Sequence, residues 1–208
     1  MERDALSIIL KTKVVAIIRK LDYERAIKTI DCLYKNGVTV FEVTLNTNQA
    51  FDIIRYAKDT YGDKILVGVG TVLDKDGVLN AINAGAEFIL TPNLYEEVVS
   101  TCIENHILVI PGVLTPTEIA NACRLGCKMV KIFPITSMAD NYMKQVTAPL
   151  DSVKIMAVGG INNDNVLKYL NGGADCVGVG YLADSKLINS DNFYELGKRI
   201  RDFVNKIN

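Results

Sequence analysis

A lysine within a short apolar run is the residue whose type and position could support covalent chemistry. Lys131 lies in the run Met129–Phe133, whose four remaining residues are all apolar. Burying a charged ammonium group costs several kcal/mol, and a lysine in such a place commonly loses its proton because burial lowers its pKa. A neutral amine attacks ketones and forms an iminium. A structural alternative is equally open, in which the side chain faces the helix layer and reaches water or forms an ion pair.

Glu42 stands in a similar setting, within Phe41–Leu45. A buried carboxyl group beside a lysine could shuttle protons. It could equally be a structural partner of Lys131, or of Arg19, which follows the first apolar run. If Lys131 and Glu42 face the same cavity, they form a nucleophile and a base, and the pair predicts attack on a ketone with proton transfer.

Glycines follow the last two apolar runs of the chain. Gly159 and Gly160 come directly after Val153–Val158, and Gly180 comes directly after Cys176–Val179. In barrels of parallel strands, phosphate commonly binds at these places, on backbone N–H groups and a helix N-terminus. A tight turn alone also needs glycine, so the signal is weak by itself. The chain contains neither a complete dinucleotide-binding fingerprint nor a P-loop.

The elements that must position these residues form a regular pattern. Short apolar runs, most of them rich in valine and isoleucine, begin about 20 to 27 residues apart. Runs that are apolar on both faces are typical of parallel strands covered on both sides. The spacing leaves room for one strand, one helix and two short loops in each unit. The runs are Val14–Ile18, Val38–Leu45, Ile65–Val69, Phe88–Leu90, Ile107–Ile110, Met129–Phe133, Val153–Val158 and Cys176–Val179.

The stretches between the runs carry helix signals. Asp22 can cap a helix that ends at Asn36-Gly37. Thr115 and Glu118, with a proline between them, form a capping-box pattern. Eight strand-then-helix units predict an α/β fold, a single-domain (β/α)8 TIM barrel over residues 1–208, whose chemistry lies at the C-terminal ends of the strands. The main alternative is an open, doubly wound sheet.

Composition and charge exclude several classes of protein. Hydrophobic residues make up 49% and charged residues 23% of the 208, which argues against a disordered, collagen-like or disulfide-scaffold chain. The 23 Lys plus Arg and 24 Asp plus Glu give a net charge of −1, which does not indicate a nucleic-acid-binding surface. We expect neither a membrane span nor a signal peptide, because no long apolar run and no cleavage pattern is present.

The thiols and the single histidine do not indicate a metal site. Cys123 and Cys127 are the only close pair, and two thiols with the distant His106 do not complete a zinc site. His106 stands at the start of the fifth run, the non-catalytic end of a barrel, where a structural role is expected. Scattered cysteines in odd number fit reduced thiols and a cytoplasmic protein. They are Cys32, Cys102, Cys123, Cys127 and Cys176.

Seven short segments, taken in their order along the chain, resemble an aldolase family. Its members act on 2-keto-3-deoxy-6-phosphogluconate (KDPG) and 4-hydroxy-2-oxoglutarate (KHG), and its relatives act on 2-keto-3-deoxy-6-phosphogalactonate. The resemblance covers nearly the whole chain. The segments that carry it are Ala16–Arg19, Phe41–Asn46, Val67–Leu73, Thr91–Asn93, Pro111–Val113, Lys131–Pro134 and Ala157–Ile161.

The resemblance implies a function and a set of site residues. It implies a class I aldolase that needs no metal or cofactor, forms a Schiff base on Lys131, uses Glu42 as acid and base, and assembles as a homotrimer. Its substrates would be a keto sugar acid and pyruvate. The substrate-binding residues that it implies are Arg19, Thr71, Pro92, Phe133, Gly159, Gly160 and Gly180.

Three positions depart from the gluconate-type members. Asn46 stands where many carry arginine, so a bidentate carboxylate clamp is missing. Val158 stands where threonine is usual, which leans toward the galactonate type or toward relaxed C4 stereochemistry. Tyr181 stands where the family usually places a serine on the phosphate. Two alternatives stay open: a phosphosugar isomerase or epimerase that uses Glu42 without a covalent lysine, and a non-catalytic sugar-acid-binding barrel, which Asn46 and Tyr181 would allow.

Overall fold

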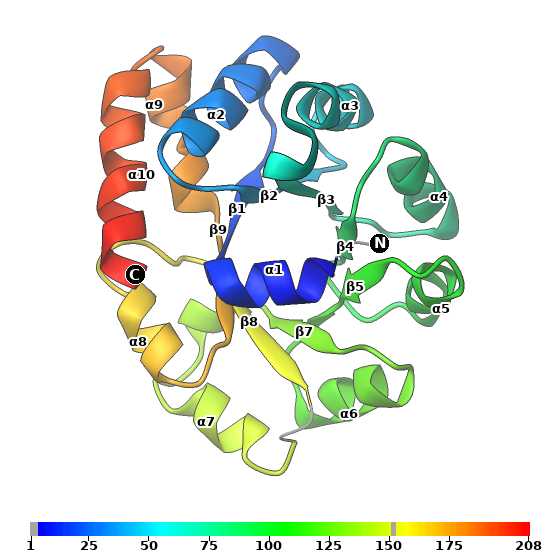
Figure 1. Cartoon of the computed structure of the whole chain (residues 1–208). Helices are drawn as coiled ribbons and strands as arrows, with labels where there is room; N and C mark the ends of the chain where they lie inside the picture. Colours follow the sequence, from blue (N-terminus) through cyan, green and yellow to red (C-terminus); the bar gives the residue numbers. More distant parts are fainter. Residues whose placement is uncertain (1–3, 151–152) are drawn as a thin grey trace.

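The computed structural model describes residues 4–150 and 153–208, which form one parallel β-sheet surrounded by helices (Figure 1). The order of strands in the sheet is β5-β4-β3-β2-β1-β9-β8-β7-β6, and every described pairing is parallel. The strands are β1 (Val14–Ile18), β2 (Val40–Thr44), β3 (Leu66–Gly70), β4 (Phe88–Leu90), β5 (Leu108–Ile110), β6 (Gly112–Val113), β7 (Met129–Ile132), β8 (Lys154–Val158) and β9 (Cys176–Val179).

The two ends of this sheet order are parts of one stretch of chain. Only Pro111 separates β5 from β6, and proline has no N–H to give to a strand ladder. The first part pairs with β4 and the second with β7, where the Lys131 N–H donates to the Pro111 carbonyl at 2.8 Å. The sheet therefore curls into a nearly closed barrel whose strands correspond to the eight predicted runs. The TIM-barrel prediction is confirmed, and the alternative of an open, doubly wound sheet is wrong.

Helices follow the strands and form the outer ring of the barrel (Figure 1). The predicted caps are confirmed, because the Asp22 side chain accepts the N–H of Arg25 and a complete capping box joins Thr115 to Glu118. The helices are α1 (Ala5–Thr12), α2 (Tyr23–Lys35), α3 (Ala50–Tyr61), α4 (Lys75–Asn83), α5 (Glu96–Glu104), α6 (Pro116–Arg124), α7 (Tyr142–Thr147), α8 (Val166–Asn171), α9 (Ser185–Asn189) and α10 (Phe193–Ile207). The 3-10 turns within the described residues are η1 (Gly62–Lys64), η2 (Ile135–Ser137) and η3 (Gly180–Ala183).

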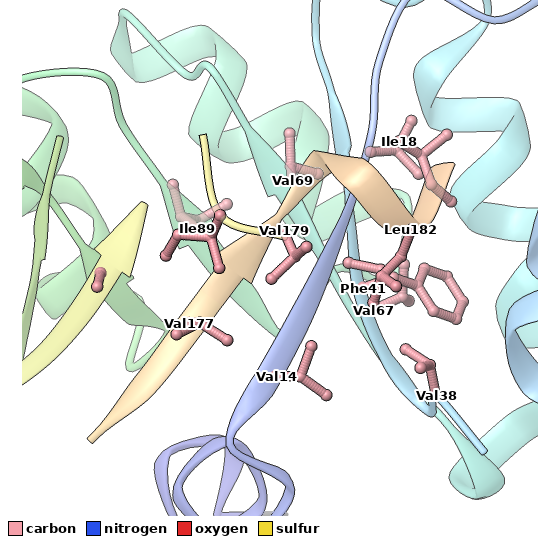
Figure 2. Packing of buried hydrophobic residues seen from close by; sticks show 14 of the residues in the cluster. Val14, Ile18, Val38, Phe41, Val67, Val69, Ile89, Val177, Val179 and Leu182 are labelled. Carbon is pink, nitrogen blue, oxygen red and sulfur yellow. The ribbon is translucent and has the colours of Figure 1, made fainter. Parts of the chain in front are cut away.

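Two apolar layers hold the barrel together. The larger one lies between the strands and the outer helices, and Figure 2 shows part of it around Phe41, Val67 and Leu182. Alternate residues of the same strands point inward, because successive side chains of a strand face opposite sides of a sheet. These inward residues form the second cluster, which includes Val40, Met129, Met156 and Cys176 among others.

Helix α1 closes the amino-terminal end of the barrel. It directly precedes β1 and lies across the barrel axis in Figure 1, and its Ala5 and Ile9 belong to the interior cluster. The opposite end, where the strands finish, holds the loops that carry the candidate site. No helix within the described residues has the length and apolar character that crossing a membrane requires.

Candidate active site

Lys131 lies on β7 and faces the interior of the barrel. It stands two residues after Met129, a member of the interior cluster, and two steps along a strand return to the same face. Its neighbours in the sheet are Gly112 on β6 and Met156 on β8, and only 8% of the residue is exposed. Of the two orientations that the sequence left open, the chain adopts the one that buries the amine among apolar side chains.

Glu42 occupies the equivalent place on β2. It follows Val40, another interior residue, by two positions, and it is 3% exposed. Its Oε2 atom is buried without a hydrogen-bond partner among the residues that the structure describes. The carboxyl group fits because β3 has Gly70 beside it, where any Cβ atom would overlap with Oε2. Sequence reasoning missed this role of Gly70, since the glycine becomes significant only once the strand register is known.

Burial pushes both groups toward their neutral forms, and the attraction between them opposes this shift only in part. Desolvation raises the pKa of Glu42 above its usual range, and the positive charges of Lys131 and Arg19 only partly oppose this. Desolvation lowers the pKa of Lys131, Glu42 opposes the shift, and Arg19 adds to it. A lysine with a lowered pKa supplies the neutral amine that attack on a ketone needs, and a carboxyl group with a raised pKa is a stronger base than an ordinary carboxylate.

Arg19, Thr71 and Pro92 lie just after the ends of β1, β3 and β4, on the same side of the sheet as Glu42. Arg19 is exposed directly after β1, and it acts electrostatically on both Lys131 and Glu42. Thr71 follows β3 with a left-handed φ of 61° and is half-buried. Pro92 follows β4, in a turn where the buried Thr91 hydroxyl donates to a backbone carbonyl two residues on. The chain therefore brings all three to the end of the barrel at which Glu42 and Lys131 lie.

Phe133 connects the lysine to the glycine pair after β8. Its ring centroid lies 5.5 Å from the Lys131 Nζ atom, and the residue is 39% exposed at the mouth of the barrel. Gly159 and Gly160 have φ values of 106° and 73°, which favour glycine. A Cβ atom at Gly159 would lie 3.2 Å from the Phe133 ring, so the glycine loop packs directly against the segment that follows β7.

An asparagine that sequence reasoning missed holds this loop in place. The side-chain amide of Asn165 donates to the Gly160 carbonyl at 3.0 Å, and its Oδ1 accepts the Asn162 N–H at 2.9 Å. One side chain thus ties together the two ends of the turn between β8 and α8. The sequence gives a weak signal for this role, because an asparagine just before a helix is a common cap.

Comparison with known proteins agrees with this geometry. A family model described as KDPG and KHG aldolase matches residues 6–199. The chain belongs to this aldolase family. It is 33% identical to the 2-dehydro-3-deoxy-6-phosphogalactonate aldolase of Escherichia coli K12, over 84% of each chain. It is 32% identical to the 2-dehydro-3-deoxy-phosphogluconate aldolase of Haemophilus influenzae, over 94% of this chain and 92% of the relative.

A solved structure adds a chemical observation. The KDPG aldolase of Legionella pneumophila, described as holding pyruvate captured as a covalent carbinolamine intermediate, superposes with a TM-score of 0.89 at 25% identity. The alignment covers 97% of this chain and 98% of that structure. The predicted membership of a family of Schiff-base aldolases, which are carbon–carbon lyases, is confirmed.

The positions that depart from the gluconate-type members have local partners. The Thr44 hydroxyl donates to Asn46 Oδ1 at 2.7 Å, and Thr44 also contacts Thr47, which accepts the Lys20 N–H at 3.0 Å. Asn46 itself is exposed beside the end of β2. Its amide oxygen therefore takes part in ordering the loops after β1 and β2. Because residue 46 is asparagine, the aldolase has no arginine guanidinium at this position.

Tyr181 turns toward the outer layer of this aldolase. It follows Gly180, which is exposed at the end of β9, and packs against the larger apolar cluster. The guanidinium carbon of Arg199 on α10 lies 4.2 Å from the centroid of its ring, and Arg199 also forms a 2.6 Å ion pair with Asp184. The aromatic ring therefore stacks on the outer helix, and the backbone of Gly180 is left at the mouth of the barrel.

The single histidine lies at the end of the barrel opposite to these residues. His106 is exposed in the turn before β5, at the amino-terminal end of the barrel, and all five cysteines are free. Among residues 4–150 and 153–208, no group of three or more histidine, cysteine or acidic side chains is arranged to hold a metal ion.

Proposed function

We propose that the protein is a class I aldolase that reversibly cleaves a 2-keto-3-deoxy sugar acid to pyruvate and an aldehyde, with Lys131 as the nucleophile. The observation that carries the proposal is the inward-facing, 8% exposed Lys131 whose burial lowers its pKa, paired with the buried Glu42. An amine of this kind is suited to capture a ketone. Membership of the KDPG and KHG aldolase family supports the same reaction.

The reaction begins at the C2 ketone of the substrate. The neutral Lys131 amine adds to C2, and loss of water from the carbinolamine gives an iminium. Glu42, directly or through a water, accepts the proton of the C4 hydroxyl as the C3–C4 bond breaks. The electron pair of that bond moves into the iminium and forms an enamine, while C4 becomes the carbonyl carbon of the departing aldehyde.

The second half of the reaction releases pyruvate. The protonated Glu42 returns its proton to C3 of the enamine, and water then hydrolyses the resulting iminium to pyruvate and the free lysine. The raised pKa of Glu42 suits this double use, because it makes the carboxylate a stronger base in the first half while the protonated group remains an acid in the second.

The remaining site residues have binding roles in this proposal. Thr71 and Pro92 line the pyruvate end, with Arg19 nearby to hold the carboxylate and to favour the neutral amine. Phe133 covers the Schiff base, and the backbone N–H groups of the loop after β8 and of Gly180 hold the phosphate of the substrate. The substrate is of the 6-phosphogluconate, 6-phosphogalactonate or 4-hydroxy-2-oxoglutarate type, and glyceraldehyde 3-phosphate is the aldehyde released from the phosphorylated forms.

Borohydride reduction in the presence of pyruvate tests the nucleophile. Reduction converts an iminium into a stable secondary amine, so the peptide that contains Lys131 gains mass and the enzyme loses activity. The Lys131→Ala variant gains none, and Lys128→Ala, which removes an exposed lysine at the other end of β7, is trapped like the wild type. An unmodified Lys131 peptide in folded protein would reject the Schiff base and favour an isomerase, an epimerase or a binding protein.

We also propose that the protein is a cytoplasmic homotrimer with a single domain in each subunit. The family resemblance supports a homotrimer, which light scattering of the purified protein would measure. The five free cysteines support a cytoplasmic location. The continuous sheet supports a single domain over residues 1–208.

A further inference from the structure

The end of the substrate farthest from Lys131 lacks the side-chain hydroxyl donor that is usual in the aldolase family. Tyr181 stands where a serine hydroxyl is usual, and its ring is stacked on Arg199 in the outer layer. A phosphate held by backbone N–H groups alone lacks the additional O–H donor that a serine provides. A hydroxyl donor for this phosphate would therefore have to come from the residues around the loop at Gly159 and Gly160.

A continuous set of contacts leads from the lysine to that loop and beyond it. The Phe133 ring lies 5.5 Å from Lys131 Nζ, and the same ring would lie 3.2 Å from a Cβ atom at Gly159. At the next residue, a Cβ atom on Gly160 would lie 2.5 Å from Oγ1 of Thr136. The Thr136 hydroxyl therefore lies directly beside Gly160, on the side where a Cβ atom at that residue would point.

The Thr136 side chain is available to a ligand. The residue is exposed on η2, and no hydrogen bond within the described residues engages its hydroxyl. A threonine hydroxyl can donate to an anionic oxygen while its methyl group packs against the loop. A ligand oxygen held by the Gly159 and Gly160 amides would come within reach of this donor.

The loop that faces Thr136 is held in a fixed shape. Asn165 binds the Gly160 carbonyl and the Asn162 N–H at the same time, which orients the peptide groups of the turn. A donor placed against a fixed loop loses little further freedom when an anion binds, and such preorganisation favours affinity.

We propose that Thr136 is a substrate-binding residue that donates its hydroxyl to the terminal phosphate of the sugar acid, taking the place of the serine that Tyr181 replaces. This inference rests on the proposed aldolase function and specifies that phosphorylated 2-keto-3-deoxy acids are its substrates. Thr136 acts on binding of the distal group, and it has no part in Schiff-base formation at Lys131.

Paired substrates separate this role from a general effect on the fold. Pyruvate release from 2-keto-3-deoxy-6-phosphogluconate, or its galactonate epimer, is compared with release from the unphosphorylated acid. Because a hydrogen bond to a charged group is stronger than one between neutral groups, Thr136→Val should raise KM for the phosphorylated substrate by about tenfold or more. KM for the unphosphorylated acid should stay within about twofold. Thr136→Ser, which keeps the hydroxyl, should recover most of the loss.

The neighbouring hydroxyl provides a matched control. Ser137 is exposed on the same 3-10 turn and does not adjoin the glycine pair in the contacts above, so Ser137→Ala should leave KM for both substrates unchanged. An equal loss on both substrates in Thr136→Val, or no loss on either, would overturn the inference. A wild-type enzyme that prefers the unphosphorylated acid would overturn it as well.

Trapping with pyruvate alone distinguishes failure of the inference from failure of the proposed function. Pyruvate carries no distal phosphate, so borohydride should modify Lys131 in Thr136→Val as fully as in the wild type. Normal trapping with unchanged KM values rejects the role of Thr136 and leaves the aldolase in place. Absence of trapping in the wild type rejects the aldolase itself, and the inference with it.

Discussion

At the scale of single residues, the chemistry depends on two side chains that are costly to bury. A fully buried carboxyl group without a hydrogen-bond partner destabilises a protein, and Glu42 has both properties within the described part of the chain. The cost is smaller when the group is protonated, which is why its pKa is raised. Buried titratable groups with shifted pKa values are characteristic of catalytic sites.

Replacing Glu42 with glutamine tests whether this carboxyl group moves protons. Glutamine keeps the size of the side chain but cannot accept a proton, so kcat for cleavage should fall by a factor on the order of 10² or more. Schiff-base formation with pyruvate should persist, because Lys131 is intact. Turnover and borohydride trapping measured on the same preparation separate the two steps, and wild-type turnover in Glu42→Gln would assign the base to another group.

The lowered pKa of Lys131 predicts how trapping depends on pH. Only the neutral amine reacts, so the rate of adduct formation with pyruvate should rise with pH, with a midpoint below the ordinary lysine value of about 10.4. Because Arg19 favours the neutral amine and Glu42 opposes it, Arg19→Gln should move the midpoint up and Glu42→Gln should move it down. Shifts in the reverse directions would contradict the electrostatic arrangement. Lys20→Gln, an exposed neighbour of Arg19, is the matched control.

At the scale of elements, the strands set which residues meet across the barrel. The apolar runs predicted the strands closely, and β1, β4 and β9 have the predicted bounds. Lys131 and Glu42 could be found because each is a charged residue in an apolar run. Gly70, Thr136 and Asn165 could not, because their significance lies in contacts with other strands and loops. Those contacts depend on register and loop conformation, which local sequence does not determine.

The fit between β2 and β3 gives a prediction at this scale. A methyl group at Gly70 would overlap with the Glu42 carboxyl group, and close-packed interiors have no spare room for it. Gly70→Ala should therefore displace Glu42 and lower kcat without abolishing the pyruvate adduct on Lys131. The control is Gly173→Ala, which is strained by its positive φ but places no atom near an added Cβ, so it should lower stability and leave kcat unchanged. A fully active Gly70→Ala enzyme would show that Glu42 needs no such space.

At the scale of the whole molecule, the two ends of the barrel have different tasks. The chemistry-bearing residues gather where the strands end, whereas α1 covers the end where the strands begin. The sequence predicted the barrel from its repeated units, but α1 was not among them. Its apolar residues precede the first strand and have no repeat spacing of their own, so only the closed barrel shows what they cover.

This division predicts that a substitution in α1 changes stability and leaves catalysis alone. Ile9 is fully buried against the barrel interior, and Ile9→Ala removes apolar contacts and leaves a cavity, which typically costs about 2 to 5 kcal/mol. Thermal or denaturant unfolding should show a loss in this range, while KM and kcat stay near wild-type values at a temperature where the variant is folded. Lys11→Ala, on the exposed face of the same helix, should leave both properties unchanged. A selective loss of kcat in folded Ile9→Ala would mean that packing at the closed end also positions Lys131 and Glu42, and the two ends would then have to be treated as one coupled unit.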